Sequence, residues 1–153
     1  MAILKKLLFL MLSFVIVGLI VACEQENIID IEKIEYREDI EPLSTRFPKL
    51  GEIEHCYWKA AIFSNVGIGP TSYWMKGFLV LSTSKIKELV DTFDWESKEL
   101  IFPLGIDPSV TGLSDFDWRY SKGFSREIKG ALFVGDFYVD ANHGVVYFDL
   151  ENN

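Results

Sequence analysis

Residues 131–150, "ALFVGDFYVDANHGVVYFDL", contain two apolar runs separated by a turn signal. In an extended chain, apolar residues recur on one face of each run: Phe133, Phe137 and Val139 in the first, and Val146, Phe148 and Leu150 in the second. The intervening "DANHG" ends in Gly144, and glycine readily adopts the positive φ that hairpin turns need. These residues therefore predict a C-terminal β-hairpin with one buried face.

Upstream segments supply further strands and two helices. Residues 53–63 alternate as a strand, and residues 73–81, "YWMKGFLVL", are apolar on both faces, which predicts a central strand. A helix is predicted over 84–93, with Ser84 as its N-cap, and a shorter one over 121–129 that ends at Gly130. The predicted fold is therefore α+β: a mainly antiparallel sheet of about four strands, two helices and the C-terminal hairpin.

The first 23 residues have the pattern of an export signal. Lys5 and Lys6 precede an apolar run of about 15 residues, which is shorter than the roughly 20 that span a bilayer. The run ends in "IVAC" (20–23), which resembles the lipobox of bacterial lipoproteins. That resemblance implies cleavage between Ala22 and Cys23 and a diacylglycerol on the Cys23 sulfur. It covers only this segment and identifies no family for the mature domain.

This resemblance implies three regions. Residues 1–22 are a cleaved signal peptide, residues 23–50 are a lipidated cysteine and a tether, and residues 51–153 are one α+β domain. The tether is predicted because residues 24–50 are rich in acids and contain Pro42 and Pro48. Its isoleucines leave room for a short helix or an edge segment. The protein is then expected at the cell membrane or outer membrane, with its domain on the extracytoplasmic side.

The net negative charge of the chain disfavours nucleic acids and anionic lipid surfaces as partners. The formal charge of the 153-residue chain is −8, and loss of residues 1–22 removes two lysines and no acid, which makes it −10. Such a body gains nothing from counterion release on nucleic acid and is repelled by anionic lipid headgroups. The membrane is therefore expected to be contacted through the lipid on Cys23, and a basic protein is the expected partner of the domain.

The irregular stretch 102–118, "FPLGIDPSVTGLSDFDW", is the predicted partner-binding loop. It combines acids with aromatic side chains that can hold a basic partner by charge and ring contact; these residues are Asp107, Asp115, Phe116, Asp117 and Trp118. Two other interpretations stay open. The aromatic residues can cap the core of a packed surface loop, and the acids can bind calcium, although their spacing is not that of an EF-hand.

No catalytic, cofactor-binding or metal-binding pattern is recognised. Cys56 lies on the apolar face of the first strand and is expected to be a core residue, His55 points to the opposite face, and His143 lies in the hairpin turn. Asp136 and Asp149 are predicted to face each other across the hairpin. We therefore expect a non-catalytic binding domain, of the kind found in immunity or inhibitor proteins. The alternatives are an envelope hydrolase with a carboxylate site and a structural envelope component.

Overall fold

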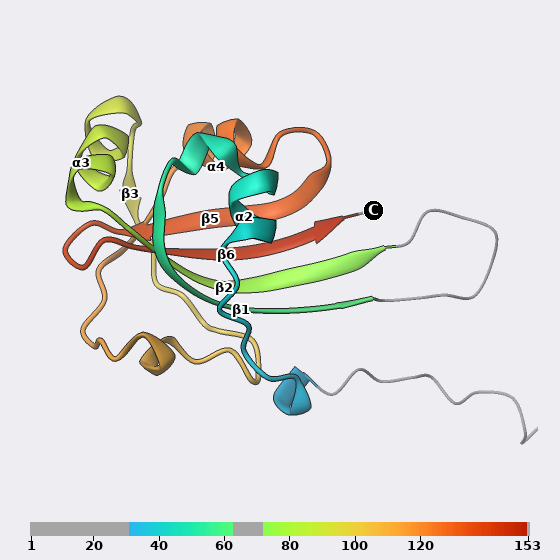
Figure 1. The fold of residues 1–153 in the computed structure, drawn as a ribbon. Helices are drawn as coiled ribbons and strands as arrows, with labels where there is room; N and C mark the ends of the chain where they lie inside the picture. Colours follow the sequence, from blue (N-terminus) through green and yellow to red (C-terminus); the bar gives the residue numbers. More distant parts are fainter. Residues whose placement is uncertain (1–30, 63–71, 153) are drawn as a thin grey trace, which may run out of the picture.

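A computed structural model describes residues 31–62 and 72–152 (Figure 1). Within these residues the strands are β1 (Ile53–Ile62), β2 (Tyr73–Leu81), β3 (Glu96–Ser97), β4 (Trp118–Tyr120), β5 (Phe133–Asp140) and β6 (Val145–Asn152). They form one antiparallel sheet in the order β1-β2-β6-β5-β4-β3. The helices are α2 (Glu41–Arg46), α3 (Thr83–Thr92) and α4 (Lys122–Lys129). Single 3₁₀ turns are η1 (Ile31–Lys33), η2 (Pro48–Leu50) and η3 (Pro108–Thr111).

The α+β class, the antiparallel sheet and the C-terminal hairpin are confirmed, but the predicted element counts are wrong. The described residues contain six strands rather than about four, because β3 and β4 are only two and three residues long. They contain three helices rather than two, because α2 forms inside the predicted tether. Strands this short are too brief to show the alternation by which a strand is recognised in sequence.

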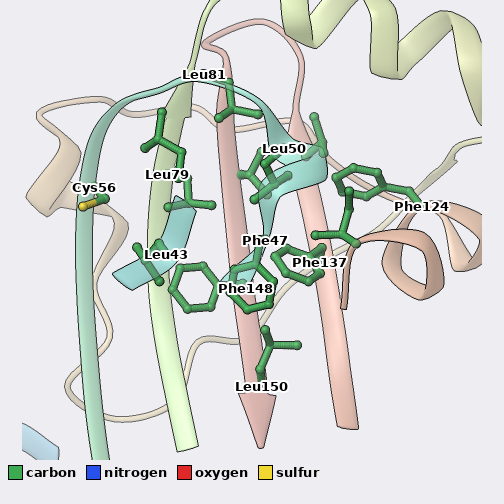
Figure 2. Close-up of a cluster of buried hydrophobic side chains, with 14 of the residues drawn as sticks. Leu43, Phe47, Leu50, Cys56, Leu79, Leu81, Phe124, Phe137, Phe148 and Leu150 are labelled. Carbon is green, nitrogen blue, oxygen red and sulfur yellow. The ribbon is translucent and has the colours of Figure 1, made fainter. Parts of the chain in front are cut away.

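α2, α3 and α4 cover one face of the sheet, here called the inner face (Figure 1). The core beneath them joins residues from the helices and from the long strands (Figure 2). Phe47 lies against Phe137 with ring centroids 5.3 Å apart, and both side chains are fully buried. Cys56 is 2% exposed and belongs to this core, as expected from its place in the strand.

Residues 41–50, which the sequence analysis assigned to the tether, belong to the folded domain. Leu43, Phe47 and Leu50 are 0% exposed and point from α2 and η2 into the inner core (Figure 2). An extended spacer would leave these three side chains in water, at a cost of roughly 1.5–3 kcal/mol each. The prediction of an extended tether is therefore wrong for this part of 23–50.

The N-terminal segment crosses from one face of the sheet to the other at the edge of β1. Arg37 pairs with Trp58 through two backbone hydrogen bonds, of 2.7 and 3.0 Å. Before this bridge, Ile31 accepts a hydrogen bond from Lys59 Nζ on the outer face. After the bridge, the chain enters α2 on the inner face. The crossing covers part of an edge strand that would otherwise expose its backbone groups.

The opposite long edge, along β5, is closed by side chains of α4. Beyond the short pairing with β4, Ser125 Oγ donates to the Phe137 carbonyl at 3.1 Å and accepts from the Phe137 amide at 3.0 Å. Lys129 Nζ donates to the Gly135 carbonyl. These bonds satisfy backbone groups that a further strand would pair with, so this part of the edge is protected against strand addition.

The helix termini follow local signals, with one correction. α4 starts after Ser121, whose side chain accepts from the Phe124 amide, and stops at Gly130, as predicted. α3 is capped by Ser82 rather than by the predicted Ser84, because Ser82 Oγ accepts from the Lys85 amide at 3.3 Å. The N-cap therefore lies two residues earlier than the sequence analysis placed it.

Candidate functional site

The β3–β4 loop (residues 98–117) covers part of the outer face of the sheet and forms a second core there. Its buried or half-buried apolar residues pack on the strands; the buried members of this core are Phe78, Ile106, Trp118, Val145 and Tyr147. Phe102 of the loop lies 5.0 Å from the Tyr147 ring and 5.8 Å from the Phe78 ring. The loop thus covers the middle of this face, and the aromatic side chains that it buries there contribute strongly to stability.

An aromatic row runs across five strands of the outer face. It consists of residues that are direct partners in the strand register: Tyr57, Phe78, Tyr147, Tyr138 and Tyr120. Tyr147 and Tyr138 are stacked with centroids 5.8 Å apart, and Tyr138 is 5.6 Å from Tyr120. Burial raises the pKa of Tyr147, Tyr138 and Tyr120 above the usual value for a phenol. These hydroxyls are therefore protonated at neutral pH and can donate hydrogen bonds.

A charged row lies beside the aromatic row. Lys59, Lys76, Asp149 and Asp136 are register partners on β1, β2, β6 and β5, so two cations are followed by two anions. Lys76 Nζ is 2.7 Å from Asp149 Oδ1, and Lys129 Nζ is 3.9 Å from Asp136 Oδ1. The predicted opposition of Asp136 and Asp149 is confirmed by this register.

The two rows are linked by hydrogen bonds from tyrosine to carboxylate. Tyr147 donates to Asp149 Oδ2, and Tyr120 donates to Asp136 Oδ1, both at 3.3 Å. The negative charge of Asp136 is the second cause, after burial, of the raised pKa of Tyr120 and Tyr138. Each carboxylate is thus oriented by a tyrosine and balanced by a lysine, and it keeps further lone pairs available to a cation from outside.

The anionic end of this row opens into a hollow of about 320 Å³, here called the acidic hollow. Its lining residues are Val134, Gly135, Asp136, Tyr138, Asp149 and Glu151. Like charges directly opposite each other in a sheet disfavour folding. Proteins tolerate a few such arrangements at functional sites, and Asp136 and Asp149 are opposed in this way although each lies near a lysine. The arrangement suits a lysine or arginine side chain, with the Tyr138 ring as a flat apolar wall.

The predicted loop residues do not form one surface site, because the two aromatic residues face the core. Trp118 is 7% exposed and starts β4, and Phe116 stacks on it with centroids 4.9 Å apart. The interpretation that these rings cap the core is therefore confirmed. Trp118 has little surface left with which to contact a partner.

The three aspartates of the loop that were predicted to bind a partner each engage local partners. Asp107 caps η3 by accepting from the Ser109 amide at 2.8 Å, which holds the pKa of its carboxyl below the usual range. Asp117 forms an ion pair of 2.8 Å with Arg119. Asp115 is exposed and has a φ of 57°, which places it in the left-handed region. Partner binding by these acids stays a prediction.

A buried carboxylate that the sequence analysis did not single out organises the hairpin turn. Asp140 is 0% exposed and accepts from the amides of Asp117, Asn142 and His143 at 2.8, 2.8 and 3.1 Å. It also lies 3.1 Å from His143 Nδ1. The motif "DANHG" gave the signal, since aspartate often caps its own turn. Asp140 ties the end of the β3–β4 loop to the β5–β6 turn.

Among the residues that the structure describes, no hydrogen bond or ion pair joins the Asp140–His143 pair to a nucleophile. His143 packs against Phe116 on the outer face, whereas Cys56 belongs to the inner core. Burial raises the pKa of the Cys56 thiol to about 11, so this group is protonated at neutral pH. Within residues 31–62 and 72–152, no three His, Cys, Asp or Glu side chains form a metal-ligand group.

Two further hollows open on the described surface. One, of about 570 Å³, lies between the end of α3 and the start of α4, where Asp94 and Glu96 face Lys122. The other, of about 300 Å³, includes Arg37 and Arg46 beside Trp58. The first mixes charges of both signs. In the second, each arginine already binds a local partner, Asp39 for Arg37 and the Pro42 carbonyl for Arg46.

The predicted anchor lies outside the described residues. Ala22 and Cys23 both precede residue 31, where the description begins. No helix in the described part of the chain is long and apolar enough to cross a membrane. Comparison of the chain with models of known protein families found no match, and comparisons with curated proteins and with solved structures found none either.

Proposed function

We propose that this protein is a lipid-anchored component of the bacterial cell envelope. The proposal is supported by the sequence of its first 23 residues: Lys5 and Lys6, the apolar run, and a cysteine directly after Ala22. Two or more acyl chains hold a protein firmly in a bilayer, whereas one chain binds only reversibly. Replacement of Cys23 by alanine is expected to abolish lipidation and release the domain from membranes. Unchanged mass and membrane retention in that variant would contradict the anchor.

We further propose that the domain binds a basic protein without transforming it, as immunity and inhibitor proteins do. The observation that carries this proposal is the opposition of Asp136 and Asp149 beside an uncovered hollow that also contains Glu151. The negative charge of the mature chain, −10 after loss of residues 1–22, supports the same class of partner, because it steers cationic surfaces toward the domain.

The partner can be identified by crosslinking in intact cells and then captured by the purified mature chain. Asp136→Asn and Glu151→Gln are expected to weaken capture about tenfold or more each, since each removes a charge from the hollow. Asp115→Asn is the matched control, because it removes an exposed acid from the β3–β4 loop and asparagine tolerates the left-handed backbone. If only the Asp115 variant loses capture, the loop rather than the hollow binds the partner. If all three variants bind normally, neither does.

An envelope hydrolase is the second candidate, and the same pair of acids favours it. Two carboxylates on one open face can act as a general acid and a general base on a glycan. Each carboxylate interacts with a lysine and a tyrosine. These contacts would orient the two acids equally well in a non-catalytic binding surface. A panel of cell-wall and glycan substrates separates the two proposals. Turnover that is lost in Asp136→Asn supports the hydrolase, and absence of turnover on the panel retires it.

A further inference from the structure

Two apolar side chains of the β3–β4 loop project into solvent. Ile101 is 95% exposed and Leu104 is 74% exposed, the largest values among the exposed apolar residues of the described chain. Leu104 occupies the tip of a tight turn, in which the Ile106 amide donates to the Pro103 carbonyl at 3.0 Å. Gly105 follows with a φ of 78°, the positive value that a type II turn requires at this position.

The loop that carries these side chains is firmly held. Phe102 and Ile106, which flank the turn, pack into the outer core, and Ile106 is only 4% exposed. Ile101 and Leu104 are therefore not exposed because the loop is loosely attached. Their backbone is fixed by their neighbours while their own side chains lack cover from the described domain. Exposed apolar residues that are gathered in one segment mark an interaction surface more often than scattered ones do, and Ile101 and Leu104 lie three residues apart in this loop.

The turn lies beside the point where the chain enters the domain (Figure 1). A Cβ atom on Gly105 would lie 3.1 Å from the Glu32 nitrogen and from the Ile31 carbonyl carbon, so the two backbones are in close contact. Nearby, the Asp107 amide donates to the Tyr36 hydroxyl at 2.8 Å. These contacts hold the turn against residues 31–36.

Chain length places this part of the domain close to the lipid. Ile31 follows Cys23 by eight residues, which reach at most about 28 Å when extended. A compact domain of this size is about 35 Å across. The surface around Ile31 therefore stays within about 28 Å of the lipidated cysteine, a distance smaller than the width of the domain.

We propose that Leu104 and Ile101 insert into the interface of the bilayer in which the Cys23 lipid is embedded. This proposal rests on the proposed lipid anchor, and it assigns a membrane-facing side to the domain. The exposed charged residues of the segments around the turn are four acids and two lysines: Glu32, Lys33, Glu35, Lys98, Glu99 and Asp107. The acids outnumber the lysines, so the contact suits zwitterionic headgroups better than anionic ones. A short tether gives an effective concentration of about a millimolar or more, so a weak contact suffices.

The test places a fluorophore on the lipidated mature chain. Separate Ile101→Cys and Leu104→Cys variants are labelled with an environment-sensitive dye and reconstituted into phosphatidylcholine vesicles whose acyl chains carry nitroxide quenchers. Labelling is selective, because Cys56 is 2% exposed and its thiol is protonated at neutral pH. Arg126→Cys is the matched control, since Arg126 is exposed on α4, on the opposite side of the sheet.

Quenching at positions 101 and 104 is expected to exceed that at position 126 at least threefold, and to fall when phosphatidylglycerol replaces part of the phosphatidylcholine. Equal, weak quenching at all three positions on chains that float with the vesicles would overturn the membrane contact and leave the anchor intact. Chains that lack the lipid mass and do not float would instead refute the anchor. Amide hydrogen exchange of the unsubstituted lipidated chain gives a second readout, in which vesicles should slow exchange in residues 101–105 but not in α4.

Discussion

Replacing Phe47 by alanine is expected to lower the free energy of unfolding by about 3–5 kcal/mol, the usual cost of truncating a buried phenylalanine. Phe47 is 0% exposed, and its ring lies 5.4, 5.3 and 6.4 Å from the rings of Phe133, Phe137 and Phe148. The side chain therefore packs the junction between α2 and η2 against both strands of the C-terminal hairpin. A single domain has a total stability of roughly 5–15 kcal/mol, so this loss takes a large share.

The measurement is urea unfolding of the mature chain carrying Cys23→Ala, followed by tryptophan fluorescence. With a slope of about 1–3 kcal/mol per molar urea, the midpoint should fall by roughly 2 M, and the slope should stay unchanged. Thr45→Ala is the matched control, because Thr45 is exposed on α2 next to the same segment. It should alter the stability by less than about 0.5 kcal/mol.

Comparison of the two variants tests whether residues 41–50 are packed on the domain or form an extended spacer. If residues 41–50 were an extended spacer, Phe47→Ala would behave like Thr45→Ala. A Phe47→Ala chain that unfolds within about 0.5 kcal/mol of the parent, a typical surface effect, would therefore refute the packing of η2 on the hairpin.

Three further experiments, two with substitutions and one on the unchanged chain, test the closed β5 edge, the β5–β6 register and the burial of Cys56. Ser125→Ala should cost about 1–3 kcal/mol in urea unfolding, because it leaves the buried Phe137 amide and carbonyl without their partner; a loss under 0.5 kcal/mol would contradict this pairing. Gly135→Ala should lower Tm by several degrees, since its Cβ would lie 2.0 Å from the Asp149 carbonyl oxygen, and an unchanged Tm would argue against the β5–β6 register. Cys56, with a pKa raised from 9.0 to about 11, should react with thiol reagents at pH 8 at least 100-fold more slowly in the folded chain than in urea. Rapid labelling of the folded chain would contradict the burial of Cys56. Because the thiol pKa is higher in the folded chain than in the unfolded one, the stability linked to this thiol is present below pH 9 and is lost as the pH rises through about 11. Urea unfolding should therefore show a more stable chain at pH 8 than at pH 10.5.

The sequence was sufficient for the long elements, because their patterns are local. β2 has the bounds predicted from residues 73–81, since its side chains are apolar on both faces of a central strand. α4 was predicted from the i, i+4 pair Phe124 and Ile128 and from Gly130, which is the C-cap of the helix. In each case the residues that specify the element lie within it or next to it.

α2 was missed although its residues carried a usable signal. Leu43, Phe47 and Leu50 recur at i, i+4 and i+7, the spacing of one helix face, and Pro42 stands at the start of the helix, where proline is favoured. The acids and two prolines of this region were interpreted as marks of a spacer. The apolar spacing was the better guide, because Leu43, Phe47 and Leu50 must be buried whatever the net charge around them.

β3 and β4 could not be predicted in the same way, because the contacts that define them are tertiary. Trp118 becomes part of a strand by pairing with Asp140, which lies 22 residues later, and the pairing of Glu96 with Tyr120 spans a similar distance. An aromatic residue among acids also looks the same in sequence whether its ring faces solvent or a core. Both interpretations of Trp118, as a contact residue and as a cap of the core, therefore stayed open in the sequence, and the structure shows that its ring closes the outer core.

One part of the candidate site, the opposition of its two aspartates, could be predicted from the sequence, and the position of its lysine could not. A short hairpin turn sets the register of its two strands, so the opposition of Asp136 and Asp149 could be inferred from residues 131–150. The place of Lys76 beside Asp149 depends on the pairing of β2 with β6, which joins residues 65 to 79 positions apart. The β3–β4 loop then determines which residues of the outer face are exposed. It covers Tyr147, which is 3% exposed, and leaves the Asp149 side chain 32% exposed. The same loop that removes Trp118 from solvent therefore leaves the acid pair accessible, and this is why the binding surface is sought on β5 and β6 and not in the loop itself.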